Sequence, residues 1–252
     1  MADNIRPSSV IPDPEPESSD PNKFINSVFA LPEIKSLLEK ISRIAGYIHH
    51  KNWAEANAGN LSVNINHILK NWDKSQLISY ENYATQWFLV SRSGSRYRDM
   101  ALEPEAHLVL VSVFQDKHQY YPGDAVPTSE WITHHYLQQQ FEQDKVVLHT
   151  HPASIIALSH LPEYLSPQIL EIELFNLLPE LKLYLPSGIA FANYAAPGSR
   201  DLMQETARVL NHQKALIWQH HGILCFGKDL DEAFDYMEIV NKAVEIWFLL
   251  KK

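Results

Sequence analysis

Segment 214–227, KALIWQHHGILCFG, places two apolar runs on either side of a short bend. The bend is too short for the crossover helix that parallel strands require, so the two strands are expected to pair antiparallel. Residues 183–198 are predicted to form a second, similar pair of short strands, broken by turn residues. No GxGxxG motif opens a helix after the first strand, which disfavours a Rossmann fold. The pattern predicts an α/β chain of α+β character, a single domain with helices flanking a central, mainly antiparallel sheet.

Apolar spacing predicts the other elements of this domain. After Pro32, apolar residues recur on one stripe as far as Ile48, which indicates a helix with proline in its first turn. Further helices are expected over 128–142, 152–160, 166–178, 199–212 and 230–250, and strands over 86–91, 107–114 and 145–151. Helix caps are expected at Thr128 or Ser129, at Ser199, and at Asp229 or Asp231.

The first 22 residues differ in composition from the rest of the chain. Five prolines lie there among serines and acidic residues. Such a segment does not bury enough apolar surface to offset the conformational entropy lost on ordering. Residues 1–22 are therefore expected to form a disordered acidic tail, and residues 23–252 a single folded domain.

Charge and cysteine content exclude several classes of protein. The formal net charge is −9, and such a surface repels phosphate backbones, so nucleic acid is not an expected partner. Cys225 is the only cysteine, which rules out an internal disulfide and fits a reducing compartment. No stretch approaches the roughly 20 apolar residues of a membrane span, and the N-terminus lacks the pattern of a signal peptide. We expect a cytoplasmic protein with no membrane partner.

Two groups of histidines have the spacing of a metal site. His149 and His151 end an apolar strand, and residues i and i+2 of a strand point to the same side. His220 and His221 precede Gly222 at the bend of segment 214–227, and one of them could complete a set of three. Spacing alone does not choose between these two. Three histidines with open positions describe a catalytic zinc site, although surface histidines are the alternative explanation of the HxH pair.

Two other features of the helix over 128–142 bear on the site. His134 and His135 are a competing histidine pair, but adjacent positions on a helix diverge, so we expect them at the surface or at an interface. Glu130 lies in the first turn, where a carboxylate either interacts with the helix dipole or serves as a general base beside a metal. The free N–H groups at the helix start, with the hydroxyls of Thr128 and Ser129, form a potential anion site.

Five motifs in order along the chain carry a family resemblance: WAEANAGNLSV, FLVSRSG, VPTSEW, VVLHTHP and QHHGILCFG. Together they resemble the class II aldolase/adducin family from about residue 30 to the end. The resemblance implies one α/β domain, a homotetramer with active sites at subunit interfaces, and one zinc ion per chain. It implies cleavage of a ketose 1-phosphate into dihydroxyacetone phosphate and an aldehyde. The expected substrate is L-rhamnulose 1-phosphate, which yields L-lactaldehyde.

The resemblance also assigns roles to individual residues. It implies His149, His151 and His221 as zinc ligands, which selects His221 over His220, and Glu130 as the general base. The groups that resemble the phosphate-binding residues are Asn57, Asn60, Ser93, Gly94, Thr128 and Ser129. Glu180, in the segment PELKLYLPSG, resembles a second acid that the neighbouring subunit supplies, with a plain surface glutamate as the alternative.

One departure from the family pattern leaves the substrate open. The phosphate loop, usually threonine-glycine-serine-glycine, reads Ser91-Arg92-Ser93-Gly94 here. Arg92 either binds phosphate directly or tilts the loop and alters substrate choice. The alternatives are a family enzyme for another sugar phosphate, of the fuculose-1-phosphate aldolase or ribulose-phosphate 4-epimerase type, and a non-catalytic adducin-like module.

Overall fold

The computed structural model describes residues 21–70, 85–143 and 145–251. The predicted tail therefore lies outside the described residues as far as position 20, and helix α1 begins at Pro21. The expected boundary between tail and domain stays a prediction.

One mixed sheet forms the centre of the described chain. Its eight strands lie in the order β4-β3-β2-β1-β5-β8-β7-β6. Along the chain the strands are β1 (Asn60–Asn64), β2 (Gln86–Ser91), β3 (Leu108–Phe114), β4 (Lys117–Tyr121), β5 (Val146–Thr150), β6 (Ile189–Ala192), β7 (Ala215–Trp218) and β8 (Gly222–Gly227). Every neighbouring pair is antiparallel except β6 and β7, which are parallel. The predicted mainly antiparallel sheet is confirmed.

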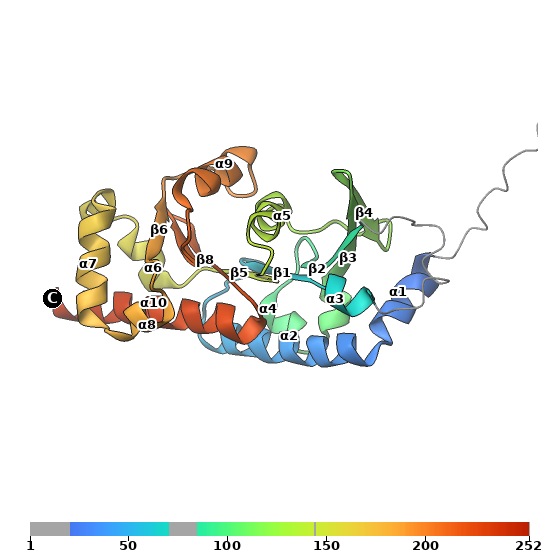
Figure 1. The fold of residues 1–252 in the computed structure, drawn as a ribbon. Coiled ribbons are helices and arrows are strands. Elements are labelled where there is room, and N and C mark those ends of the chain that lie inside the picture. The colour runs from blue at the N-terminus through green and yellow to red at the C-terminus, as the bar shows by residue number, and fades with distance from the viewer. Residues whose placement is uncertain (1–20, 71–84, 144, 252) are drawn as a thin grey trace, which may run out of the picture.

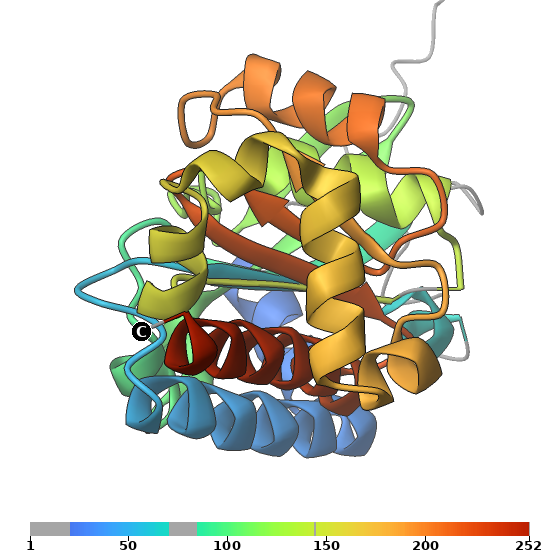
Figure 2. The ribbon, with the colours of Figure 1, turned by 90° about the vertical axis from the view of Figure 1, so that its left-hand side faces the viewer.

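Helices cover both faces of this sheet. The α-helices are α1 (Pro21–Phe29), α2 (Pro32–His50), α3 (Asn66–Leu69), α4 (Tyr97–Met100), α5 (Trp131–Gln140), α6 (Ala153–Leu158), α7 (Pro167–Leu177), α8 (Glu180–Tyr184), α9 (Arg200–Val209) and α10 (Leu230–Leu250), with 3-10 turns at Pro104–His107 and Pro162–Leu165. The long helices α2 and α10 lie side by side along one face, and α5 and α9 lie on the other (Figures 1 and 2).

Apolar residues pack on both faces of the sheet. The larger core joins the sheet to α2 and α10, and its fully buried members include Ile34, Ile41, Ile48, Leu61, Leu148, Met237 and Val244. A smaller core under α5 and α9 contains Leu137, Val147, Leu216, Trp218 and Phe226. Successive residues of β5, Val147 and Leu148, thus enter different cores, as the period of two of a strand requires. Polar residues on β1 and β5 occupy the centre of the α5 side.

Two predictions about the C-terminal half need correction. Residues 183–198 do not form a strand pair, because Leu183 and Tyr184 belong to the short helix α8 and only β6 is a strand. β6 also pairs parallel with β7, since α9 connects the two and supplies the length that a crossover needs. The antiparallel pairing of β7 with β8 is confirmed. So are the caps at Ser199 and Asp229, whose side chains accept hydrogen bonds from the backbone N–H groups of Leu202 and Glu232.

Candidate metal centre and phosphate pocket

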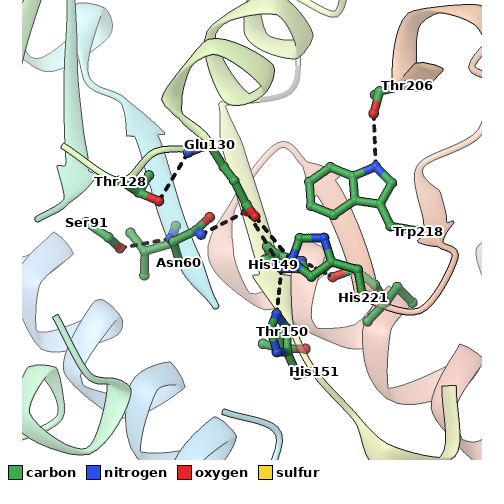
Figure 3. A network of polar contacts seen from close by, with 12 residues as sticks. Asn60, Ser91, Thr128, Glu130, His149, Thr150, His151, Thr206, Trp218 and His221 are labelled. Atoms are coloured by element: carbon green, nitrogen blue, oxygen red, sulfur yellow. Dashed lines mark hydrogen bonds and ion pairs between the residues drawn. The ribbon is translucent and has the colours of Figure 1, made fainter. Parts of the chain in front are cut away.

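Three histidine side chains converge where β5 ends and β8 begins. His149 is on β5, His151 follows that strand directly, and His221 precedes β8. The antiparallel pairing of these strands, with Thr150 opposite Ile223, brings the two ends together. One ligand nitrogen from each histidine lies within 4.8 Å of the other two (Figure 3). His149 Nε2 and His151 Nε2 are 3.0 Å apart.

Each ring of this histidine triad is held by a second group. His149 Nδ1 lies 2.8 Å from the carbonyl oxygen of Ile223, and His151 Nδ1 lies 3.0 Å from Glu55 Oε1. Both oxygens accept, so both Nδ1 atoms donate, and in the neutral rings both Nε2 atoms carry lone pairs. The His221 ring stacks on Trp218 with centroids 5.1 Å apart and planes at 17°. Trp218 in turn donates from Nε1 to Thr206 Oγ1 at 2.9 Å (Figure 3).

The electrostatics of the triad fit a cation. Burial, and then the neighbouring His151, lower the pKa of His149 well below its usual value. Burial, followed by His149, lowers the pKa of His221 to about 3. These rings are therefore neutral at pH 7 and present lone pairs at close range, which repel one another unless a positive charge lies between them. Imidazole nitrogens are the usual ligands of a catalytic zinc ion, and an oxygen acceptor on the outer nitrogen fixes the orientation of such a ring. The Ile223 carbonyl and the Glu55 carboxylate do this for His149 and His151, whereas the outer nitrogen of His221 has no hydrogen-bond partner among the described residues.

Gly222 is required beside the triad. A Cβ built on it would overlap the carbonyl oxygen of Thr150 and lie 3.1 Å from His151 Cδ2 and 3.2 Å from His149 Cε1. Any larger residue would push β8 away from the end of β5 and separate His221 from the other two histidines. The sequence pattern HHG thus combines a ligand with the glycine that allows the close approach.

Glu130 faces the triad with a carboxylate that is only 4% exposed. Its Oε1 lies 3.3 Å from His221 Nε2, and its Oε2 lies 3.7 Å from His149 Nε2 (Figure 3). Asn60 Nδ2 donates to Oε2 at 2.9 Å. The expected cap at Thr128 or Ser129 is wrong, because α5 begins later, at Trp131, with Glu130 in the N-cap position and no side-chain cap. The Glu130 carboxylate is directed to the histidines rather than to its own helix.

A pocket of about 140 Å³ opens beside Glu130, His151 and His221. It contains all six residues singled out as phosphate-binding groups: Asn57, Asn60, Ser93, Gly94, Thr128 and Ser129. Backbone hydrogen bonds hold two of its loops together, from Ser93 N to the carbonyl of Val126 at 2.7 Å and from Thr128 N to that of Ser91 at 2.8 Å. Arg92 also lines the pocket. The lining therefore offers hydroxyl, amide and N–H donors and one guanidinium.

Other residues singled out from the sequence lie elsewhere. Glu180 is exposed on α8 and lines a different hollow with Trp53 and Asp235, so within one chain it does not reach the pocket of Glu130. His220 is exposed, and its ring stacks on His160 with centroids 3.9 Å apart. Its neighbour His221 is the histidine that joins the triad.

The expected position of His134 and His135 at the surface or at an interface is wrong, because the chain itself covers them. Both are buried, at 0% and 7% exposure. They diverge as predicted: His134 contacts Ser62 of β1, and His135 packs against Trp131. Adjacent positions on a helix predict that two side chains diverge, but not what covers each of them.

Sequence reasoning missed two residues that hold the triad, Glu55 and Trp218. Glu55 lies inside the motif WAEANAGN, where it is the only carboxylate, and that isolation was the available signal. Trp218 has the pattern of a core residue, which it also is. Among the described residues, no helix has the length and apolar character needed to cross a bilayer.

Comparison with known proteins identifies the family. The sequence model described as "Class II Aldolase and Adducin N-terminal domain" matches residues 39–248. A rhamnulose-1-phosphate aldolase from Bacteroides thetaiotaomicron is 28% identical over 236 residues, 87% of this chain and 88% of that protein. One from Listeria welshimeri is 27% identical over 88% of this chain and 84% of its own. The crystal structure of a sugar-phosphate aldolase from Thermotoga maritima matches with a TM-score of 0.74 and 29% identity, over 86% and 96% of the two chains. The chain belongs to the class II aldolase and adducin family, and it is one of that family's metal-dependent aldolases.

Proposed function

We propose that this protein cleaves L-rhamnulose 1-phosphate into dihydroxyacetone phosphate and L-lactaldehyde with one zinc ion per chain. The observation that carries the proposal is the convergence of three histidines and one buried carboxylate on the wall of a donor-lined pocket. The names of the Bacteroides and Listeria relatives support the choice of substrate.

His149, His151 and His221 would hold the zinc. Their lone pairs face one another, and their outer nitrogens or ring faces are fixed by Ile223, Glu55 and Trp218. Bound there, zinc would act as a Lewis acid that stabilises the negative charge developing on the oxygens of the three-carbon fragment. No lysine lines the pocket, so its lining offers no amine for a Schiff base.

Glu130 would move the carbon-bound proton. When the carbon–carbon bond breaks, its electron pair stays with the three-carbon fragment, and the hydroxyl of the other fragment loses a proton as it becomes the aldehyde. The fragment carbon must then gain a proton, and in the reverse reaction it must lose one. Glu130 borders the pocket, and Asn60 Nδ2 fixes one carboxylate oxygen, so the carboxylate is placed to give and take that proton.

The pocket beside Glu130 would bind the substrate phosphate. Its donors are mostly neutral groups, of which Ser93, Thr128 and Ser129 supply hydroxyls and the loop backbone supplies N–H groups. Such a cradle allows an acidic protein to bind an anionic substrate. Arg92 adds one positive charge at the same pocket and makes no ion pair with any other described residue.

We also propose a cytoplasmic homotetramer in which Glu180 acts from a neighbouring subunit. The exposed position of Glu180, away from its own chain's Glu130 pocket, is compatible with that role. Light scattering gives the assembly. Glu180→Gln should lower activity in an assembled enzyme without changing zinc content, whereas an unchanged rate would make Glu180 a plain surface residue.

The first experiment measures dihydroxyacetone phosphate release from L-rhamnulose 1-phosphate, with chelator and with zinc added back. Release that the chelator stops and zinc restores is the expected result. Zinc bound at one ion per chain without release would move the substrate to another sugar phosphate. Cobalt and manganese serve as parallel additions, because a three-histidine site also accepts them.

The second experiment tests Glu130. Glu130→Gln should keep zinc and lose on the order of 10²–10⁴ in the rate of proton exchange at the carbon of dihydroxyacetone phosphate. Full exchange in this variant would remove Glu130 from the proposed role. Glu105→Gln, at an exposed residue that is not part of the pocket lining, is the matched control and should exchange at the wild-type rate.

A different sugar phosphate is the second candidate, and Arg92 is the observation that favours it. This arginine stands where the family usually has glycine and lines the phosphate pocket. The Thermotoga relative, at 29% identity, is named only as a sugar-phosphate aldolase. A panel that includes L-fuculose 1-phosphate and L-ribulose 5-phosphate distinguishes the two candidates by relative kcat/KM.

A further inference from the structure

Helix α5 contacts strand β1 through polar side chains rather than apolar ones. Asn60 and Ser62 are two residues apart and lie on one side of β1, while Glu130, His134 and Gln138 are four apart and lie on one side of the helix. Asn60 contacts Glu130, and Ser62 contacts both His134 and Gln138. We call these five residues the α5–β1 seam. All five are buried, with exposures of 8% or less.

The hydrogen bonds of the seam have a fixed direction. Gln138 Nε2 donates to the backbone carbonyl of Lys145 at 2.7 Å, which leaves Gln138 Oε1 as an acceptor. Ser62 Oγ donates its one proton to that Oε1 at 3.2 Å. Ser62 Oγ also lies 3.0 Å from His134 Nδ1, and with its proton already used it must accept there. His134 is therefore present as the Nδ1–H tautomer.

These hydrogen bonds anchor α5 to the sheet at a definite position. Lys145 directly precedes β5, Ser62 is on β1 opposite Val147 of β5, and both strands belong to the centre of the sheet. Burial lowers the pKa of His134 to about 4, so the ring is neutral at pH 7 and keeps its single Nδ1 proton for Ser62. Buried polar groups that must find one another fix register more strictly than apolar contacts, which tolerate sliding.

The seam continues directly into the proposed base. The backbone N–H of His134 donates to the carbonyl of Glu130 at 3.1 Å, one turn earlier, and the Glu130 side chain meets Asn60 on the same side of β1. Glu130 sits at the N-cap position, with no earlier helical turn to hold it. Its distance to the triad therefore depends on how α5 is seated on β1.

We propose that His134 is a positioning residue for Glu130, which it holds in place by fixing the seat of α5 on β1 through Ser62 and Gln138. This rests on the proposed role of Glu130 in proton transfer. His134 itself touches neither substrate nor the triad's outer partners. A shift of about 1 Å at a reacting group costs on the order of 10²-fold in rate, so loss of the seam should slow exchange while zinc remains bound.

The experiment compares four variants of the zinc-loaded enzyme by zinc content, melting temperature and proton exchange at dihydroxyacetone phosphate. His134→Leu removes the donor to Ser62, and His134→Asn keeps a donor at the place of Nδ1. Ser62→Ala breaks the same series of hydrogen bonds with a smaller change in the side chain. It takes the place of His134→Leu if that variant does not fold. His135→Asn is the matched control, since His135 is buried on the same helix but outside the seam.

The expected result is a loss of roughly 10- to 100-fold in exchange for His134→Leu and a smaller loss for Ser62→Ala, with zinc retained. His134→Asn should recover most of the rate, and His135→Asn should stay near wild type. The deciding measurement repeats His134→Leu in a Glu130→Gln background, where no further loss is expected because the residue it positions is gone.

Three outcomes would overturn the proposal. An equal loss in both backgrounds would mean that His134 acts on the fold as a whole. If His135→Asn lost as much exchange as His134→Leu, the loss would follow from any disturbance of α5 and not from His134 in particular. If Glu130→Gln alone left exchange unchanged, Glu130 would not be the base, and His134 would have no base to position. This result would mark a failure of the proposed function, whereas the two outcomes above would mark a failure of the seam alone.

Discussion

Two groups of histidines, the first mostly buried and the second fully buried, differ in how their rings are arranged. The triad of His149, His151 and His221 converges, and its rings are fixed by Ile223, Glu55 and Trp218. His134 and His135 diverge from adjacent positions on α5, and the Nε2 of each has no hydrogen-bond partner among the described residues. Burial lowers the pKa of His149 and His221 in the first group and of His134 and His135 in the second.

The difference shows that burial and neutrality do not make a metal site. What the α5 pair lacks is convergence, which the triad obtains from strand geometry. Residues two apart on β5 point the same way, and the antiparallel neighbour β8 brings the third ring to them. On a helix, adjacent side chains point about 100° apart, and no shared ligand position results.

The largest expected effect separates the two groups by metal content. If the proposed zinc site is right, His221→Ala should no longer bind zinc. Its activity should fall by more than the factor on the order of 10²–10⁴ that is expected for loss of the base alone. His135→Ala should retain one zinc per chain, because its ring packs against Phe88, His118 and Trp131 and does not belong to the triad. Elemental analysis of both purified variants checks this. Zinc loss in His135→Ala would show that the α5 histidines also help to hold the metal.

A smaller effect is expected from the groups that hold the triad. Glu55→Gln removes the negative charge that orients His151 through its Nδ1, while keeping the size of the side chain. Loss of such an outer partner typically weakens metal affinity by roughly 10- to 100-fold. Competition with a chelator of known affinity gives the dissociation constant. Glu103→Gln, an exposed control, should leave it unchanged, and equal affinity in Glu55→Gln would show that the backbone alone places His151.

Local patterns predicted the convergent group well. The HxH spacing on an apolar strand and the glycine after His221 contain the information that the structure uses, because each depends on neighbours within a few residues. The same holds for the antiparallel pairing of β7 and β8 across a short bend. The choice of His221 over His220 came from the family resemblance, since spacing left both open.

Contacts between distant segments could not be predicted in this way. His134 is buried because Ser62, 72 residues earlier, lies opposite it, and Glu55 reaches His151 across 96 residues. The parallel pairing of β6 with β7 depends on α9 as a crossover, while the apolar letters of 183–198 alone suggest a hairpin. Sequence periodicity gives the direction of a side chain but not the identity of its partner.

The pH dependence of stability sharpens the comparison further. Burial lowers the pKa of both His134 and His135 to about 4, whereas unfolded histidine titrates near 6.5. Between these values the unfolded state binds protons that the folded state does not, so the free energy of unfolding falls as the pH drops from about 6.5 to about 4. Each histidine contributes a slope of up to about 1.4 kcal/mol per pH unit.

This dependence is measured by urea unfolding of the wild type and of His135→Asn between pH 7 and pH 5 at the same metal concentration, so that the contribution of the triad is common to both. His135→Asn should reduce the slope by one histidine's share. If the free energy of unfolding of His135→Asn had the same slope against pH as that of the wild type, His135 would take up its proton in the folded state. The two histidine groups would then differ in burial as well as in convergence.

The smallest expected effect concerns His220, the neighbour that spacing could not distinguish from His221. Its φ of 59° lies in the left-handed region, where glycine is favoured, and its exposed ring stacks on His160. His220→Gly relieves backbone strain of about 1 kcal/mol and loses a ring contact worth about as much, so the free energy of unfolding should change by less than roughly 1 kcal/mol. Zinc content and activity should stay within about twofold, since the ring is outside the triad. Zinc content is measured beside that of His221→Ala. Loss of zinc from His220→Gly would show that either of the two adjacent histidines can serve as the ligand, so that the position on the bend does not select His221.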